Sequence, residues 1–447
     1  MIRYHFAIET ETYARPHASP GNLGGSFANP AKMLKMRKTR RLTPAIFLTL
    51  ILFPAVAAPA SPAGDADLWA RYYTYKKEFE QRHWVDGLVA NACVDKPGGK
   101  PTEHHFGDSA LWTGVWLATL SLDYHRRPRA STLARIRETL EALERLEVVS
   151  GYLVRTDRGP EAGTWLAKPS AGQYMGVLLG YDFAYRFVDR PDVRERIRRQ
   201  TRNIAAHLQQ NAFFIMDPFG KPTPRGPSGV AFEFPWRKIF LRIAKGDFPA
   251  GKVNPAGLLS LNLDVAFGLI LKLMEPRKRY LFSLNNAHRL YSRLPRQYSN
   301  LHLLFLSSLA LMDEMDENES GEEDPEFNAA FRRLYESVAR DDPDNPLFAS
   351  IADLILGTEQ SAALTRRVLR QFPDTLPNNW DDSRFHQDNA WQRNPRQRQI
   401  AYDVPRSDGK GNCTYSEYPG LDFMLPWMLD DFLSRRKTTG KTSDGRR

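Results

Sequence analysis

The sequence predicts an all-α fold of about twelve helices. Apolar residues recur at helical spacing along most of residues 65–434, and few runs show the strict alternation of a half-buried strand. Segments that are apolar on most sides also alternate with strongly amphipathic segments. Such alternation is typical of helical hairpins that contain one buried and one half-exposed helix.

The predicted helices form pairs of unlike hydrophobicity. Residues 131–147 carry Leu133 and Ile136 on one stripe with Arg and Glu opposite, as in an outer helix. Residues 170–188 are apolar and Gly-rich, which favours burial, and residues 148–156 between the two segments predict a short β-hairpin. The predicted helices cover residues 65–83, 108–124, 131–147, 170–188, 191–210, 258–274, 277–294, 301–312, 325–340, 346–356, 359–372 and 421–433.

Two long segments interrupt this pattern. Residues 211–255 are rich in Pro, Gly and Phe, and residues 374–419 are rich in Pro, Asn, Asp, Arg and aromatic side chains. Long connections without secondary structure are usually functional or disordered, and the aromatic content argues against disorder. We therefore expect two long functional loops, whereas the acidic residues 313–324 predict only a solvated loop.

The net charge of +10 is concentrated at the two ends of the chain. Residues 1–60 hold eight Lys or Arg against two Asp or Glu, and residues 435–447 hold six against one. Residues 61–434 hold 48 basic and 49 acidic groups, so the body is nearly neutral. The basic composition therefore does not indicate a nucleic-acid partner. Residues 435–447 are expected to form a disordered tail.

Residues 33–60 predict a secretory signal peptide. A cluster of basic residues precedes the apolar run 44–56, and small residues at 58–60 or 55–57 offer alternative cleavage sites. The run is too short to span a membrane comfortably. We expect an exported protein, periplasmic or secreted, with no stable membrane anchor after cleavage. Retention of the run as an N-terminal anchor is the alternative.

Residues 1–32 are polar and unpatterned, although signal peptides usually begin close to their charges. We expect this segment to be a non-native extension, with translation starting at Met33 or Met36.

The two cysteines, Cys93 and Cys413, lie far apart in the sequence. Export to an oxidising compartment favours one disulfide between them. Two free buried thiols are the alternative.

Asp108 opens the helix predicted over residues 108–124. Asp108, Trp112 and Trp116 have the spacing i, i+4, i+8, so one helix face carries a carboxylate and two indoles. A carboxylate above aromatic rings can hold a sugar. It can equally cap a helix above a Trp-packed core. The spacing alone leaves both interpretations open.

The alternating helices resemble the six-hairpin (α/α)6 toroid of many glycoside hydrolases, unsaturated-glycuronyl hydrolases and polysaccharide lyases. Residues 107–114, Gln173-Tyr174 and residues 419–423 look like the entries to inner helices of such proteins. The resemblance implies one toroid domain over residues 65–434, with the starts of its inner helices at a central cavity. It also implies that a carbohydrate or a uronate-containing polysaccharide is the partner.

Glycoside hydrolysis commonly uses two carboxyl groups, and Asp108 is the first candidate. The candidates for the second are Asp182, Asp381, Asp382 and Asp388. Arg side chains beside indoles suit an acidic sugar, because a guanidinium binds a carboxylate with two hydrogen bonds. The predicted substrate-binding residues are His105, Trp112, Trp116, Arg155, Trp165, Gln173, Trp380, His386, Trp391, Arg393 and Tyr418. The alternative for these residues is ordinary surface ion pairing and local packing.

No sequence motif indicates a cofactor or a metal site. The sequence has no G-x-G-x-x-G, no G-x-x-x-x-G-K-[ST], no G-x-S-x-G and no H-E-x-x-H. We therefore expect an exported hydrolase or lyase that needs neither. The alternative is a non-catalytic glycan-binding or cell-envelope scaffold protein of the same fold. The sequence predicts no oligomeric state.

Overall fold

The chain divides into residues 1–62 and residues 63–447. The computed structural model describes parts of the second unit only. The described residues are 65–95, 99–159, 162–164, 166–223, 228–246, 269, 271–291, 301–312, 325–341, 343–358, 362–372, 374, 415–417 and 419–443.

The described helices separate into inner and outer helices. The inner helices are α2 (Ser109–Arg126), α4 (Ala171–Phe187), α7 (Glu233–Ala244), α10 (Leu301–Ser308) with its 3-10 continuation η4 (Leu309–Leu311), α12 (Pro346–Leu356) and α15 (Leu421–Ser443). Each contacts the next in this order, and α15 contacts α2, so the inner helices close a ring. This closure confirms the predicted all-α toroid.

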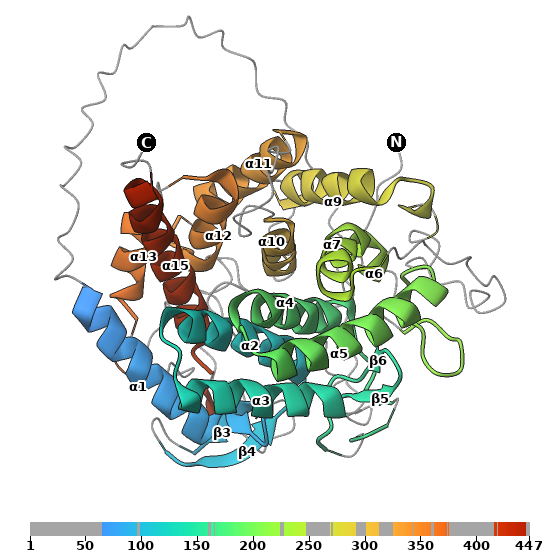
Figure 1. Ribbon diagram of the computed structural model, residues 1–447, viewed down its shortest axis with the longest axis horizontal. Helices are drawn as coiled ribbons and strands as arrows, with labels where there is room; N and C mark the ends of the chain where they lie inside the picture. The colour runs from blue at the N-terminus through green and yellow to red at the C-terminus, as the bar shows by residue number, and fades with distance from the viewer. Residues whose placement is uncertain are drawn as a thin grey trace, which may run out of the picture. The chain divides into compact units, whose positions relative to one another are not determined.

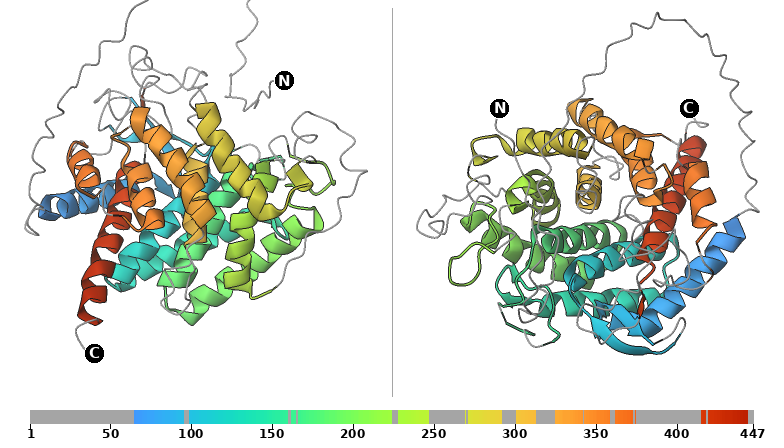
Figure 2. Two further views of the ribbon diagram at one scale, coloured as in Figure 1. Left: turned by 90° about the horizontal axis from the view of Figure 1, so that it is seen from above. Right: turned by 180° about the vertical axis from the view of Figure 1, so that it is seen from behind.

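The outer helices lie outside this ring, as Figure 1 shows for α3 and α5 beside α2 and α4. They are α3 (Ala130–Arg145), α5 (Pro191–Gln210), α9 (Pro276–Tyr291), α11 (Pro325–Asp341), α13 (Ala362–Leu369) and α1 (Ala66–Arg82). A short helix, α6 (Ser228–Ala231), precedes α7. Figure 2 shows α1 and α15, the first and last described helices, side by side.

The hydrophobic pattern of each helix explains its layer. Sixteen of the eighteen residues of α2 are buried, whereas α3 buries seven of its sixteen along a single stripe. A helix that is apolar all round must be surrounded by other elements, and an amphipathic helix covers the outside. The predicted alternation of apolar and amphipathic segments is the inner and outer layering of the toroid.

Helices α2 and α4 pack backbone to backbone through three glycines. A Cβ atom on Gly114 would lie 2.0 Å from the carbonyl oxygen of Gly176, and one on Gly180 would lie 2.4 Å from that of Gly114. A Cβ atom on Gly176 would lie 2.4 Å from the carbonyl oxygen of Leu111. No side chain fits at these positions, so glycine is what allows the two inner helices to approach this closely.

Short strands precede the inner helices α2 and α15. Strand β3 (Asn91–Val94) pairs antiparallel with both β4 (Pro101–His105) and β7 (Tyr415–Glu417). Cys93 lies opposite Ser416 in this register. Two further pairs are β1 (Trp84–Val85) with β2 (Leu88–Val89), and β5 (Glu147–Val149) with β6 (Tyr152–Leu153). The β5–β6 pair lies where the sequence predicts a hairpin.

A buried ion pair fastens β7 to the start of the described chain. The Glu417 carboxylate accepts hydrogen bonds from Arg82 Nε at 2.5 Å and Arg82 Nη2 at 2.7 Å. His83 Nε2 lies 3.1 Å from the same carboxylate. Glu417 is 2% exposed, so the partners are needed to compensate its loss of hydration.

The structure differs from the prediction at α7 and α15. The sequence predicts an irregular loop over residues 211–255, but this segment contains α6 and the inner helix α7. Trp236, Ile239 and Ile243 of α7 have helical spacing and are buried. The Pro- and Gly-rich surroundings hide this stripe, and Pro235 is tolerated because it lies in the first turn. Helix α15 continues to Ser443, into the segment expected to be disordered.

No helix among the described residues is long and apolar enough to cross a membrane. The predicted extension and signal peptide, residues 1–60, lie outside the described residues, as does most of the helix predicted over 258–274.

Candidate functional site

The starts of three inner helices converge. Trp112 in the first turn of α2 and His302 at the start of α10 stack with ring centroids 5.9 Å apart and planes inclined by 19°. A Cβ atom on Gly172, at the start of α4, would lie 3.3 Å from Leu303 of α10. Since α2 and α4 are also in backbone contact, the first turns of α2, α4 and α10 form one cluster.

Asp108 occupies the N-cap position of α2, yet its side chain makes no capping hydrogen bond. The first three N–H groups of α2, which include the usual targets of a cap, have other partners. The hydrogen bonds are Ser109 N–H to the Phe106 carbonyl (3.2 Å), Ala110 N–H to the Arg155 carbonyl (3.1 Å) and Leu111 N–H to Gln173 Oε1 (3.0 Å). The Asp108 carboxylate therefore accepts none of the helix N–H hydrogen bonds that an N-cap side chain usually accepts.

The Asp108 carboxylate is held through one oxygen. Gln173 Nε2 donates a hydrogen bond to Asp108 Oδ1 at 2.7 Å, and Arg155 Nη1 lies 3.7 Å from the same oxygen. No hydrogen bond or ion pair reaches Oδ2 from any described residue, and the Asp108 side chain is 44% exposed. A half-exposed carboxylate with one oxygen fixed and the other open can accept a hydrogen bond or a proton from a ligand.

Arg155 joins the two loops that lead into α2 and α4. Its Nη1 donates to the Gly107 carbonyl at 3.0 Å, and its Nε donates to the Lys168 carbonyl at 3.3 Å. Its backbone N–H also donates to the Ala167 carbonyl. The guanidinium is 18% exposed. It is thus fixed beside Asp108 while keeping part of its donor edge in solvent.

Four of the predicted site residues come together here: Asp108, Trp112, Arg155 and Gln173. His302 is not among the predicted site residues, because a lone His in an apolar helix is usually a core residue. His302 is indeed buried. Its position against Trp112 is a long-range contact between α2 and α10, and no local sequence signal reports such a contact.

Four of the predicted residues are buried: Trp112 (4% exposed) and Gln173 (1% exposed), which belong to the cluster, and Trp116 and Asp182. Because His302 stacks on its ring, Trp112 presents no open face to a sugar. Trp116 is fully buried and packs on Phe79 at 4.3 Å between ring centroids, so its indole has no open face for a sugar. Asp182 is also fully buried and forms ion pairs with Arg186 at 2.9 Å and Arg242 at 2.5 Å. Asp182 follows Gln173 by nine residues, about 14 Å along α4. We therefore leave Trp116 and Asp182 out of the proposed site.

His105 lies on β4 opposite Asn91, just before the loop to Asp108. Its ring makes no hydrogen bond to Asp108 in the structure, and its Nε2 is a buried atom without a hydrogen-bond partner among the described residues. Its role in ligand binding stays a prediction. The remaining predicted site residues lie outside the described residues: Trp165, Trp380, Asp381, Asp382, His386, Asp388, Trp391, Arg393 and Tyr418.

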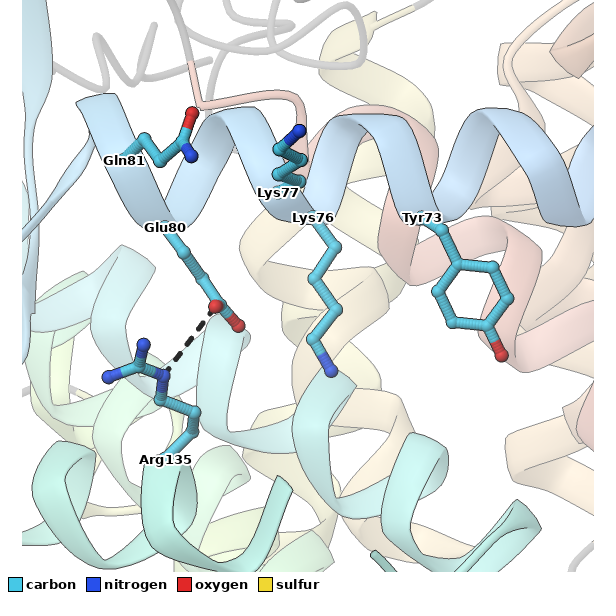
Figure 3. Close-up of a pocket in the computed structure, with 6 residues that line it drawn as sticks. All are labelled: Tyr73, Lys76, Lys77, Glu80, Gln81 and Arg135. Atoms are coloured by element: carbon cyan, nitrogen blue, oxygen red, sulfur yellow. Dashed lines mark ion pairs between the residues drawn. The ribbon is translucent and has the colours of Figure 1, made fainter. Parts of the chain in front are cut away.

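A surface pocket of about 330 Å³ lies between α1 and α3. Figure 3 shows its charged groups already paired on one side, with Glu80 3.5 Å from Arg135, while Lys77 and Gln81 point away from Arg135. Lys76 is bonded to the buried Asp123 at 2.6 Å. Because these charges satisfy one another, we do not assign the function to this pocket.

No protein-family model matches the sequence, and no curated protein is similar to it. Among solved structures, the chain is similar to the crystal structure of an unsaturated glucuronyl hydrolase specific for heparin. The two share 10% sequence identity with a TM-score of 0.35, over 84% of this chain and 99% of that chain. A match this weak carries no argument about function.

Proposed function

We propose that the protein acts on a carbohydrate at the cluster formed by the first turns of α2, α4 and α10, with Asp108 as the reacting carboxylate. One observation carries the proposal: Asp108 stands at an N-cap position but does not cap. A structural cap would use its carboxylate on the helix N–H groups. Here those groups are satisfied elsewhere, and Asp108 keeps one oxygen open to solvent.

The neighbouring side chains suit an acidic sugar. The exposed donor edge of Arg155 can bind a sugar carboxylate, while Asp108 Oδ2 accepts from a hydroxyl. We therefore propose a uronate-containing polysaccharide as the substrate class, and an exported protein as the setting. Hydrolysis requires a second carboxyl group. Asp381, Asp382 and Asp388, all outside the described residues, are our candidates for it.

A second candidate function is glycan binding without catalysis. It is favoured by the identity of the groups that touch Asp108. Among the described residues these are the amide of Gln173 and the guanidinium of Arg155, and neither can serve as the second carboxyl of a glycosidase.

A screen on polymers separates the two candidates. Residues 61–447 would be incubated with polygalacturonate, hyaluronan and alginate, and with starch and xylan as neutral polymers. New reducing ends without absorbance of an unsaturated product indicate hydrolysis, and new reducing ends with that absorbance indicate elimination. Binding of a uronate polymer without any product supports the glycan-binding protein. If the protein neither binds nor cleaves any of these polymers, both candidate functions are contradicted.

A further inference from the structure

We infer that Gln173 is a positioning residue that fixes which oxygen of Asp108 reacts. The inference rests on the proposed function only for the role of Asp108, because the contact itself needs no ligand. Gln173 is 1% exposed, lies in the first turn of α4, and bridges to α2 through both ends of its amide.

The orientation of the Gln173 amide follows from its partners. The backbone N–H of Leu111 can only donate, so the atom facing it must be Oε1. The other end, Nε2, must then donate to Asp108 Oδ1. Rotating the amide by 180° would set Nε2 against the N–H group and Oε1 against the carboxylate. Both contacts would then be repulsive.

The fixed amide makes the two oxygens of Asp108 unequal. Oδ1 receives the Gln173 hydrogen bond and lies on the Arg155 side, so it can act only as an acceptor. A proton that Asp108 takes up or gives away must therefore sit on Oδ2. Asp108 can then exchange a proton or a hydrogen bond with a ligand only through Oδ2. The hydrogen bond from Gln173 of α4 holds the plane of the carboxylate in place.

The close packing of α2 and α4 supports this geometry. Gly176 lies one turn after Gln173, and its missing Cβ would stand 2.6 Å from the Cα of Leu111. Because the helix backbones touch there, the Gln173 side chain reaches both Leu111 and Asp108. The glycines therefore act on the site through Gln173.

An amide–carboxylate exchange tests the inference without a ligand. In Gln173→Glu, two carboxylates face each other, and we expect Tm to fall by about 3 °C at pH 8 and less at pH 5, where a shared proton relieves the repulsion. Asp108→Asn retains an acceptor and should hold Tm within about 1 °C of wild type. The double variant can re-form the hydrogen bond in reverse, so its Tm should return to near the wild-type value.

Gln200 of α5 supplies a matched control, since it is another buried glutamine beside a carboxylate, Glu147. Gln200→Glu should lower Tm equally with Asp or Asn at position 108. The inference would be overturned if Gln173→Glu lowered Tm equally with Asp and with Asn at position 108, and equally at pH 8 and pH 5.

Activity on the uronate polymers distinguishes a positioning role of Gln173 from a purely structural one, because a variant can recover its Tm without recovering its activity. The double variant should recover Tm but less than about one tenth of wild-type activity, because its carboxylate at position 173 faces α2 rather than the open side. Recovery of both Tm and activity would contradict the assignment of Oδ2. If wild type acts on no polymer, the proposed function fails, and the Tm comparison still decides the role of Gln173.

Discussion

Gly114 of α2 and Gly176 of α4 are in backbone contact, with no room for a Cβ atom between the helices. The contact fixes the position of α4 along the axis of α2. It therefore also fixes where Gln173 lies beside Asp108. The same few atoms thus determine both the packing of two inner helices and the geometry of the candidate site.

Gly176→Ala should therefore destabilise the protein, although alanine favours an exposed helix over glycine. The new methyl group would lie 2.4 Å from the Leu111 carbonyl oxygen, and we expect a loss of about 3 kcal/mol or more as the helices separate. Urea unfolding measures it. Gly107→Ala is the control, because nothing lies within 4 Å of a Cβ atom there. Equal stability of the two variants would refute the close packing.

Acid should destabilise the protein through His207. Burial lowers the pKa of His207 to about 4, whereas an unfolded chain has a His pKa near 6.5. The unfolded state then binds the extra proton first, so stability is lost as the pH falls from about 6.5 through about 4, by up to about 3 kcal/mol. His207→Gln should flatten this part of the profile, measured as the urea midpoint at pH 7.5 and pH 5. Parallel profiles would show that His207 is not buried in neutral form.

Two carboxyl groups, those of Glu417 and Asp430, change the dependence of stability on pH in opposite directions. Burial raises the pKa of Glu417, but the hydrogen bonds from His83 and Arg82 outweigh it and leave the pKa lowered, so this contribution to stability is lost as the pH falls through that pKa. Burial raises the pKa of Asp430 to about 6, and its contribution is lost as the pH rises through 6. Protonation of Asp430 partly offsets the loss of stability in acid, so Asp430→Asn should make stability fall more steeply between pH 6 and pH 4.

Cys93 is fully buried and disulfide-bonded, while Cys413 lies outside the described residues. We propose Cys413 as its partner, since Ser416, three residues further along, lies opposite Cys93 in the β3–β7 pair. Peptides that contain the two cysteines should stay linked in a non-reducing digest. Reduction should cost about 4–5 kcal/mol, because the closed loop is long. Alkylation of both thiols in the unfolded, unreduced protein would exclude the pairing.

The sequence predicts the layers of this fold better than its site. Amphipathic stripes such as that of Leu133 and Ile136 report burial directly, so the helices other than the inner helix α7 could be assigned in advance. Asp108 was found as a candidate because its position at a helix start is a local property. Its loss of the capping role depends on Gln173 and Arg155, which reach it from other elements. Trp116 shares the helical spacing of Trp112, yet only the tertiary structure reveals that it packs on Phe79.

The most direct test of the account is activity of the Asp108→Asn variant on the uronate polymers. The variant keeps the shape and the Gln173 hydrogen bond but removes the charge and the proton-accepting Oδ2. We expect at least a hundred-fold loss of activity, or of affinity if the protein only binds, with Tm unchanged. Asp189→Asn, at a side chain that is 90% exposed, should retain wild-type activity as the control. Full activity in Asp108→Asn would contradict the assignment of this carboxylate.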